Sequence, residues 1–194
     1  HGMQVFGGHG YIKEHGMEQI VRDARISTLY EGTTGIQALD LLGRKVMVGT
    51  RGKCVRDFTA EVMRFAKPHA LSRGPLGKMA RSLIWRSLQW NLLTTRLMLR
   101  SAKDRDQVGA SSVDYLMYSG YVMMGYHWAL QAAKASELLG SGAGQAPEEF
   151  YRTKIHTAEF YFARLLPRAD AHQRLAMAST KSLLQIDKAH MQID

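Results

Sequence analysis

The sequence predicts an all-α protein that ends in an up-and-down bundle of four long helices. Proline is rare, with 4 residues in 194, whereas the helix-favouring residues Leu, Ala, Met, Arg and Lys dominate. Apolar residues recur at helical intervals beyond residue 50. Short glycine-containing segments separate these periodic stretches, as between antiparallel helices of a bundle.

The first 30 residues predict little regular structure. Residues 1–16 are glycine-rich, so we expect mostly loop with at most a short helical turn. The run "MEQIVRDA" (17–24) predicts a brief helix. The β-branched and aromatic run "RISTLY" (25–30) predicts an extended or irregular segment.

A helix follows at "GIQALDLLGRKVMV" (35–48), for which Thr33 or Thr34 is a suitable N-cap. Its expected apolar stripe comprises Ile36, Leu39, Leu42 and Val46.

Four amphipathic helices are predicted beyond "GTRGK" (49–53). The segment "GSGAGQAP" (140–147) closes the third, Pro167 predicts a kink or break in the fourth, and an Ala-, Leu- and Lys-rich segment follows over 170–190. We therefore place a domain boundary near residue 50, between segments 1–50 and 51–194. The expected stripes are Val55, Phe58, Val62 and Phe65; Leu76, Met79, Leu83, Ile84, Leu88, Leu92 and Leu99; Leu116, Met123 and Leu130; and Ile155, Ala158, Phe162 and Leu165.

The composition limits the class of protein. A chain of 194 residues can hold one sizeable core or one domain with a smaller attachment. No apolar run is long enough to span a membrane, and residues 1–12 lack the features of a signal peptide. The single cysteine, Cys54, favours a reducing compartment. The chain reads as one entered midway, because it opens on "HGMQVFGGHGY" without an initiator methionine.

The formal charge of +9 fits a nucleic acid, an anionic membrane surface or a phosphate-bearing small molecule. The basic residues are scattered, however, apart from short clusters at 44–45 and 100–105. This scatter favours solvated helix surface. Nucleic-acid binding is not expected, because there is no recognition motif and no basic stripe with stacking aromatic residues.

The stretch "YEGTTGIQALDLLGRK" (30–45) places a carboxylate, Glu31, just before a helix. A helix dipole alone favours a Glu there. Two other glycine-rich stretches carry no nucleotide motif: "GGHG" (7–10) follows no strand, and "GPLGKM" (74–79) fails the P-loop spacing. The choice between a structural and a catalytic Glu31 therefore depends on its context.

That context is a set of three segments in order: "QVFGGHGY" (4–11), "RDARI" (22–26) and "YEGTTGIQ" (30–37). Over residues 1–48 they resemble the C-terminal signature of the acyl-CoA dehydrogenases. The helical tail resembles the extra C-terminal domain of larger members of that family. The resemblance implies that residues 1–50 end the catalytic helical domain and that 51–194 form the extra bundle.

The resemblance implies an FAD-dependent oxidoreductase of fatty acid β-oxidation. Glu31 would remove the α-proton of an acyl-CoA thioester while the flavin accepts the β-hydride, giving the trans-2-enoyl-CoA. Gly32 matches a position whose backbone touches the thioester end of the substrate. The residues implied to contact FAD are Gln4, Gly8, Thr33, Thr34 and Gly35.

Gln4 and Gly8 match a segment that reaches the FAD of a neighbouring subunit, which implies a homodimer or higher oligomer. At Gly35 many members carry Gln, so no side-chain contact to the cofactor is expected there. The implied electron acceptor is an electron-transfer flavoprotein. The bacterial cytoplasm is the expected compartment, with the mitochondrial matrix as the alternative.

The chemistry needs a carboxylate that faces the flavin across a flat slot. A turn before a helix can aim such a side chain, and the following glycine lets the backbone approach the ligand. Leu29 and Tyr30 line the slot or belong to the core. In the family most of the pocket comes from upstream domains, so we expect these 194 residues alone to lack dehydrogenase activity.

Two other readings remain. The first is a non-catalytic helical module for interaction or membrane docking that keeps a relic of the motif; in its favour one helix carries five aromatic residues and three methionines, although bundle core is the simpler reading and membrane contact is not expected. The second is a metal site at His127, His156 and Glu159. It lacks a second Glu-x-x-His copy, so no metal is expected.

Overall fold

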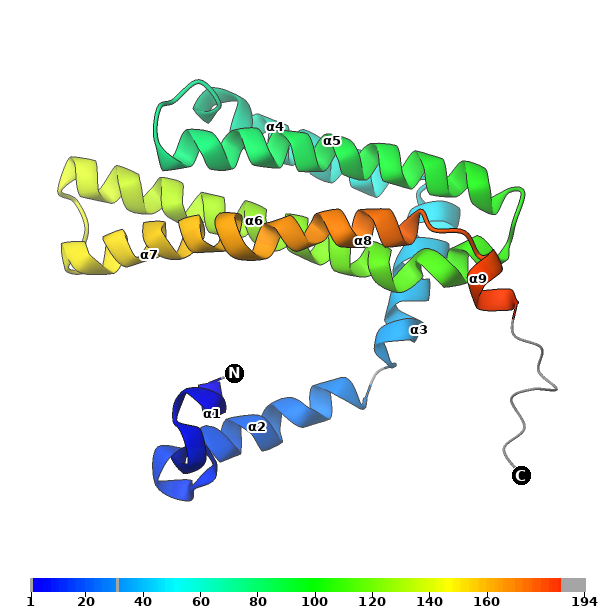
Figure 1. Cartoon of the computed structure of the whole chain (residues 1–194). Coiled ribbons are helices and arrows are strands. Elements are labelled where there is room, and N and C mark those ends of the chain that lie inside the picture. Colours follow the sequence, from blue (N-terminus) through cyan, green and yellow to red (C-terminus); the bar gives the residue numbers. More distant parts are fainter. Residues whose placement is uncertain (1, 31, 186–194) are drawn as a thin grey trace. The chain divides into compact units, whose positions relative to one another are not determined.

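The computed structural model describes residues 2–30 and 32–185, and within them every regular element is a helix (Figure 1). The all-α prediction is confirmed. The chain divides into two units, His1–Ala38 and Leu39–Asp194, which are described separately.

The N-terminal unit begins with three short helical elements, where we had expected mostly loop. They are α1 (Gly2–Val5), η1 (Gly7–Tyr11) and η2 (Lys13–His15). That expectation was wrong, because some glycines end one helical turn and begin the next, and another allows two turns to pack closely. Gly7 and Gly16 take positive φ angles of 57° and 67° at the breaks. Gly10 is buried so closely on α1 that an added Cβ would lie 1.9 Å from the Met3 carbonyl oxygen.

The predicted brief helix is confirmed as α2 (Met17–Arg25). Side chains one turn apart support it, with Arg22 donating to Glu18 at 3.0 Å. The next residues form a 3₁₀ turn, η3 (Ile26–Thr28), and so are irregular rather than extended. Local hydrogen bonds outweigh the strand propensity here, because the Ser27 hydroxyl donates to the Ala24 carbonyl at 2.6 Å.

The predicted helix over 35–48 is present as α3 (Thr34–Leu39) followed directly by a π-helix, η4 (Asp40–Gly49). Within the C-terminal unit, Leu42 and Val46 of its expected stripe are fully buried in the bundle core. Ile36 and Leu39 are exposed instead.

Four long helical stretches follow, as predicted (Figure 1). The helix α6 packs against α5 and against the fourth stretch, and α4 packs against α5. Pro167 lies where the fourth stretch leaves α-helical geometry, which confirms the predicted break. The elements are α4 (Lys53–His69), α5 (Pro75–Ser101), α6 (Asp106–Ser141), then α7 (Glu148–Phe160), η5 (Tyr161–Leu165), η6 (Leu166–Arg168) and α8 (Ala169–Ala176), and finally α9 (Lys181–Leu184). The segment expected over 170–190 runs past residue 185, and its last part lies outside the described residues.

The buried face of α6 differs from the stripe that its sequence suggested. Met123 is exposed, whereas Tyr115, Tyr118 and Val122 are fully buried. The face combines large tyrosines with small Ser, Gly and Ala, a pattern that a count of aliphatic residues misses. The tyrosines are therefore core, as the simpler reading held. In the described part of the chain, no helix is long and apolar enough to cross a membrane.

Each buried tyrosine hydroxyl has a partner on another part of the bundle. Tyr118 donates to the Arg86 carbonyl at 2.8 Å, and Tyr115 lies 2.7 Å from the Thr94 hydroxyl. Tyr161, in the fourth stretch, donates to the Tyr121 carbonyl on α6 at 2.9 Å. Burial raises the pKa of Tyr115 and of Tyr161 to about 12 and raises that of Tyr118 as well. These bonds join α6 to both neighbouring helices.

We predict that Tyr118→Phe lowers the free energy of unfolding by roughly 1–2 kcal/mol, because the buried Arg86 carbonyl loses its side-chain donor. Urea denaturation followed by far-UV circular dichroism measures this. Tyr121→Phe on the same helix is the control. The stacking of Tyr121 on His172 involves the ring and not the hydroxyl, so the variant keeps this contact. Equal losses in the two variants would contradict the role given to the Tyr118 bond.

We also predict a loss of stability at alkaline pH. An unfolded tyrosine ionises near pH 10.0, whereas Tyr115 keeps its proton until about pH 12. The unfolded state therefore binds fewer protons in this window, and stability falls by up to about 1.4 kcal/mol per pH unit for this residue. Urea denaturation between these pH values should show a shallower fall for Tyr115→Phe than for the wild type. An equal fall in the free energy of unfolding with pH for the variant and the wild type would contradict this role of Tyr115.

Candidate active site

The turn before α3 is shaped by Gly32. Its φ angle is +93°, and an added Cβ would lie 3.2 Å from Ile36 Cγ2 and 3.3 Å from Gln37 Nε2. A side chain is therefore disfavoured there by both conformation and space. The Gln37 N–H donates to the Thr33 carbonyl at 3.0 Å, which starts the helix. The glycine thus allows a sharp entry into α3.

The predicted base, Glu31, lies outside the described residues. Its described neighbours are open to ligands: Leu29 and Tyr30 are 62% and 50% exposed, and Gly32 is exposed too. Thr33 and Thr34 are also exposed, and Gly35 is partly so. An added Cβ at Gly35 would meet only the Thr33 hydroxyl, at 4.0 Å. The backbone and hydroxyl groups of this turn are accessible.

The other two residues of the predicted cofactor set lie in different elements. Gln4 is on α1 and Gly8 is in η1, both exposed, and these elements pack against α2. An added Cβ at Gly8 would meet nothing within 4 Å. The main contacts of α1 and η1 are with each other, α2 and η2 rather than with α3.

The N-terminal unit exposes a large apolar surface. Its buried residues include Gly10 and Glu18, whose Oε2 atom is buried without a partner among the described residues. A segment this small cannot supply a stable core of its own. The exposed large apolar residues are Val5, Phe6, Tyr11, Ile12, Ile20, Val21, Ile26, Leu29, Tyr30 and Ile36.

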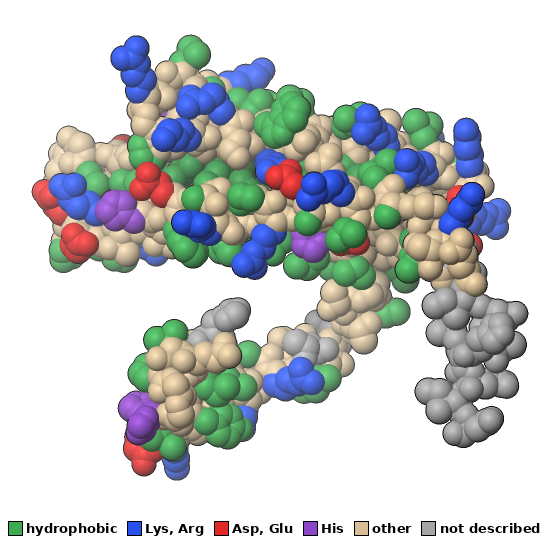
Figure 2. Space-filling view, in the orientation of Figure 1, with side chains coloured by type: hydrophobic (Ala, Val, Ile, Leu, Met, Phe, Trp, Pro, Cys, Tyr) green, Lys and Arg blue, Asp and Glu red, His purple; other side chains and the backbone are tan. Residues whose placement is uncertain are grey.

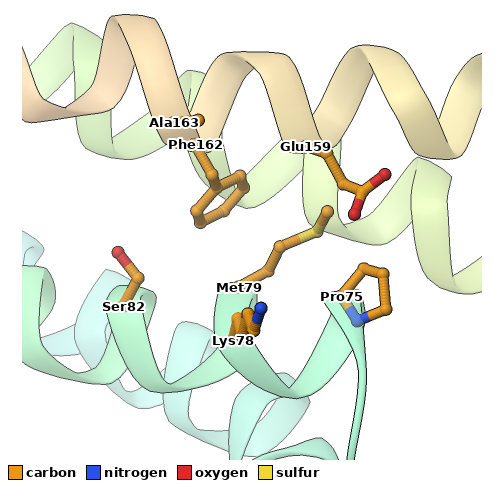
Figure 3. A pocket seen from close by; sticks show the side chains of 7 residues that line it. All are labelled: Pro75, Lys78, Met79, Ser82, Glu159, Phe162 and Ala163. Carbon is orange, nitrogen blue, oxygen red and sulfur yellow. The ribbon is translucent and has the colours of Figure 1, made fainter.

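The bundle carries a cavity of about 380 Å³ between α5 and the α7–η5 region (Figure 3). Met79 and Phe162 form apolar walls, while Lys78 and Glu159 supply one charge of each sign. Across residues 2–30 and 32–185, no three His, Cys, Asp or Glu side chains are grouped to hold a metal ion, so Glu159, His127 and His156 form no such site. No linear motif indicates this cavity, because its walls come from helices far apart in sequence.

Comparison with known families identifies the class of protein. Residues 1–47 match the family described as "Acyl-CoA dehydrogenase, C-terminal domain". Residues 58–187 match the family described as "Acetyl-CoA dehydrogenase C-terminal like". The chain therefore belongs to the acyl-CoA dehydrogenase family, of which it forms a C-terminal portion, and the resemblance seen in the sequence is confirmed.

Curated relatives include enzymes from several bacteria. A 3-methylmercaptopropionyl-CoA dehydrogenase of Ruegeria pomeroyi is 36% identical over 182 residues, covering 90% of this chain and 29% of the relative. A broad-specificity linear acyl-CoA dehydrogenase of Mycobacterium tuberculosis is 31% identical over 194 residues, covering 96% of this chain and 31% of the relative. A subunit of the caffeyl-CoA reductase-Etf complex of Acetobacterium woodii is 46% identical over 41 residues, covering 21% of this chain and 11% of the relative. The chain thus spans about three tenths of the first two relatives.

We predict opposite effects for alanine at the two glycines of the turn. Gly32→Ala should destabilise the protein by about 1 kcal/mol or more, because φ is +93° and Ile36 is close. Gly35→Ala lies in the helix and meets ordinary space, so it should be neutral or stabilising by up to about 1 kcal/mol. Thermal unfolding of the longest expressible parent chain measures both. A harmless Gly32→Ala would contradict the conformational role of this glycine.

Proposed function

We propose that this chain is the C-terminal portion of an FAD-dependent acyl-CoA dehydrogenase that oxidises an acyl-CoA thioester to the trans-2-enoyl-CoA. One observation carries the proposal. In the region that matches the family's C-terminal domain, Tyr30, Gly32 and Thr33 of the Tyr-Glu-Gly-Thr segment are exposed, and the glycine has a φ angle of +93°. Such a turn can present the Glu31 carboxylate and an unobstructed backbone to a ligand.

In this proposal Glu31 removes the proton from the α-carbon of the substrate, and that proton ends on the carboxylate. Gly32 permits close approach of the backbone to the thioester end. Hydrogen-bond donors at the thioester oxygen would stabilise negative charge as the proton leaves. FAD, when bound, supplies the acceptor for the β-hydride.

The residues expected to hold FAD are compatible with a ligand of that kind. Thr33 and Thr34 offer exposed hydroxyls beside the first turn of α3, and Gly35 leaves room for close approach. Gln4 and Gly8 lie on exposed α1 and η1, where a neighbouring subunit could use them. We therefore keep a homodimer or higher oligomer, and an electron-transfer flavoprotein as acceptor, within the proposal. The Etf-complex relative supports such an acceptor only by its name.

The dehydrogenase activity belongs to the parent chain rather than to these residues alone. The N-terminal unit exposes apolar surface that needs a cover, and the relatives are about three times as long. We propose that upstream domains of the parent provide this cover together with the rest of the acyl and flavin pocket. We also propose that the boundary between the catalytic and extra domains lies near residue 50, and that the protein acts in the cytoplasm.

The visible absorption spectrum of the longest expressible parent chain tests the function. A flavin spectrum that bleaches when acyl-CoA is added without oxygen is expected. Glu31→Gln should abolish the bleaching while the flavin stays bound, since the amide cannot accept the α-proton. Glu14→Gln, an exposed carboxylate on η2, is the matched control and should bleach normally.

A colourless protein that takes up no added FAD would overturn the proposal. The alternative, a helical interaction module with a relic of the motif, would then explain the chain better. A flavin that bleaches equally in Glu31→Gln would keep the enzyme class but remove Glu31 as its base.

A further inference from the structure

A seam between α5 and α8 has cavities with basic walls. Two adjacent cavities, of about 320 Å³ and 370 Å³, open along it and share Arg96 and Met177 as lining residues. Leu99 and Arg100 complete the first. Figure 2 shows Lys and Arg side chains on this half of the bundle face. The second is completed by Asp170, Gln173 and Arg174.

Among the described residues that line the seam, the carboxylate is Asp170, and it is already hydrogen-bonded. Asp170 receives two hydrogen bonds from Arg86 of α5, the longer from Nη2 to Oδ2 at 2.8 Å. These bonds, together with the charge of Arg174, hold the pKa of Asp170 below its usual range. Arg86 is 9% exposed, so its charge is largely matched to Asp170 rather than offered to a ligand. Asp170 thus forms its hydrogen bonds with Arg86 and offsets only part of the charge of Arg174.

Three guanidinium groups line the two cavities, and in the described part of the chain no carboxylate lies within ion-pair distance of them. Arg100 is held in place, because its Nη1 donates to the Met177 carbonyl at 2.6 Å at the shared rim. Arg96 lies at the junction, since it lines both cavities, and Arg174 lines the far one. Guanidinium forks suit phosphate oxygens, which accept two parallel hydrogen bonds from each.

We propose that the paired cavities form one binding site for a phosphorylated small molecule, best a diphosphate. Arg96 takes the bridging position, and Arg100 and Arg174 each face one phosphate group. Because Arg96 lines both cavities, a ligand with two linked anionic groups can reach all three arginines. This site lies within the bundle and does not rest on the proposed dehydrogenase activity, so its test is a binding measurement.

Isothermal titration calorimetry of the full chain with pyrophosphate, in low-salt buffer at neutral pH, tests the site. Saturable binding of one pyrophosphate per chain is expected. Arg96→Gln and Arg174→Gln should each weaken it by about tenfold or more, because each removes a charged hydrogen-bond donor. Both side chains are exposed, so the variants should fold, and circular dichroism checks this.

Arg73→Gln is the matched control, since Arg73 is an exposed arginine before α5 that lines neither cavity. Unchanged binding in this variant supports the site. Equal weakening in all three variants would show a diffuse attraction to the basic surface and overturn it. Absence of saturable binding to the wild type would overturn it as well.

Two further arms identify the source of the phosphates. ADP that binds as tightly as pyrophosphate, with the same Arg96 dependence, supports a free phosphorylated molecule. Sedimentation with vesicles of anionic phospholipid tests the other source. Arg96-dependent retention on vesicles without pyrophosphate binding would overturn the small-molecule proposal in favour of a lipid headgroup.

Discussion

The bundle depends on how α6 buries its tyrosines. An aromatic ring contributes a large apolar area to a core, but its hydroxyl must find a partner when water is excluded. Tyr118 finds the Arg86 carbonyl and Tyr115 the Thr94 hydroxyl, both on α5. Tyr161 of the fourth stretch bonds back to the Tyr121 carbonyl on α6. These directional bonds fix the position of each helix along α6, which apolar contacts alone would leave less defined.

Arg86 extends this arrangement from α5 to α8. Its carbonyl accepts from Tyr118, while its guanidinium holds Asp170 on α8. An ion pair of this kind is costly to break on one side only, because the partner is left partly buried and unpaired. It also spans α5 and α8 with polar groups where apolar side chains would otherwise fill the seam. One of the basic cavities beside Met177 has Asp170 of this pair in its wall.

The N-terminal unit, in contrast, is held together by local contacts rather than by a buried core. Short turns held by local hydrogen bonds and by close glycine contacts shape it, and most of its large apolar side chains remain exposed. A segment with so small a core takes its stability from whatever covers it. In a chain about three times as long, that cover and the reactive pocket would form together. Tyr30, Gly32 and Thr33 of the motif thus lie in a unit whose large apolar side chains are mostly exposed.

The sequence predicted the parts in which local pattern and global packing agree. The long helices follow from periodic apolar residues, and Pro167 indicates a break because a proline inside a helix removes a backbone hydrogen bond. The turns at 2–15 could not be predicted, since they depend on contacts such as Gly10 against Met3 that no propensity describes.

The same limit applies to the sites. The turn around Gly32 was predictable, because its residues are contiguous and resemble a known family. Arg96 and Arg174 looked like two of many scattered basic residues, and only the fold, in which α5 and α8 both pack on α6, brings them to one cavity. Charge becomes informative once it is known which cations already have a carboxylate. For the seam, Asp170 forms its hydrogen bonds with Arg86, and among the described residues no ion pair engages Arg96 or Arg174.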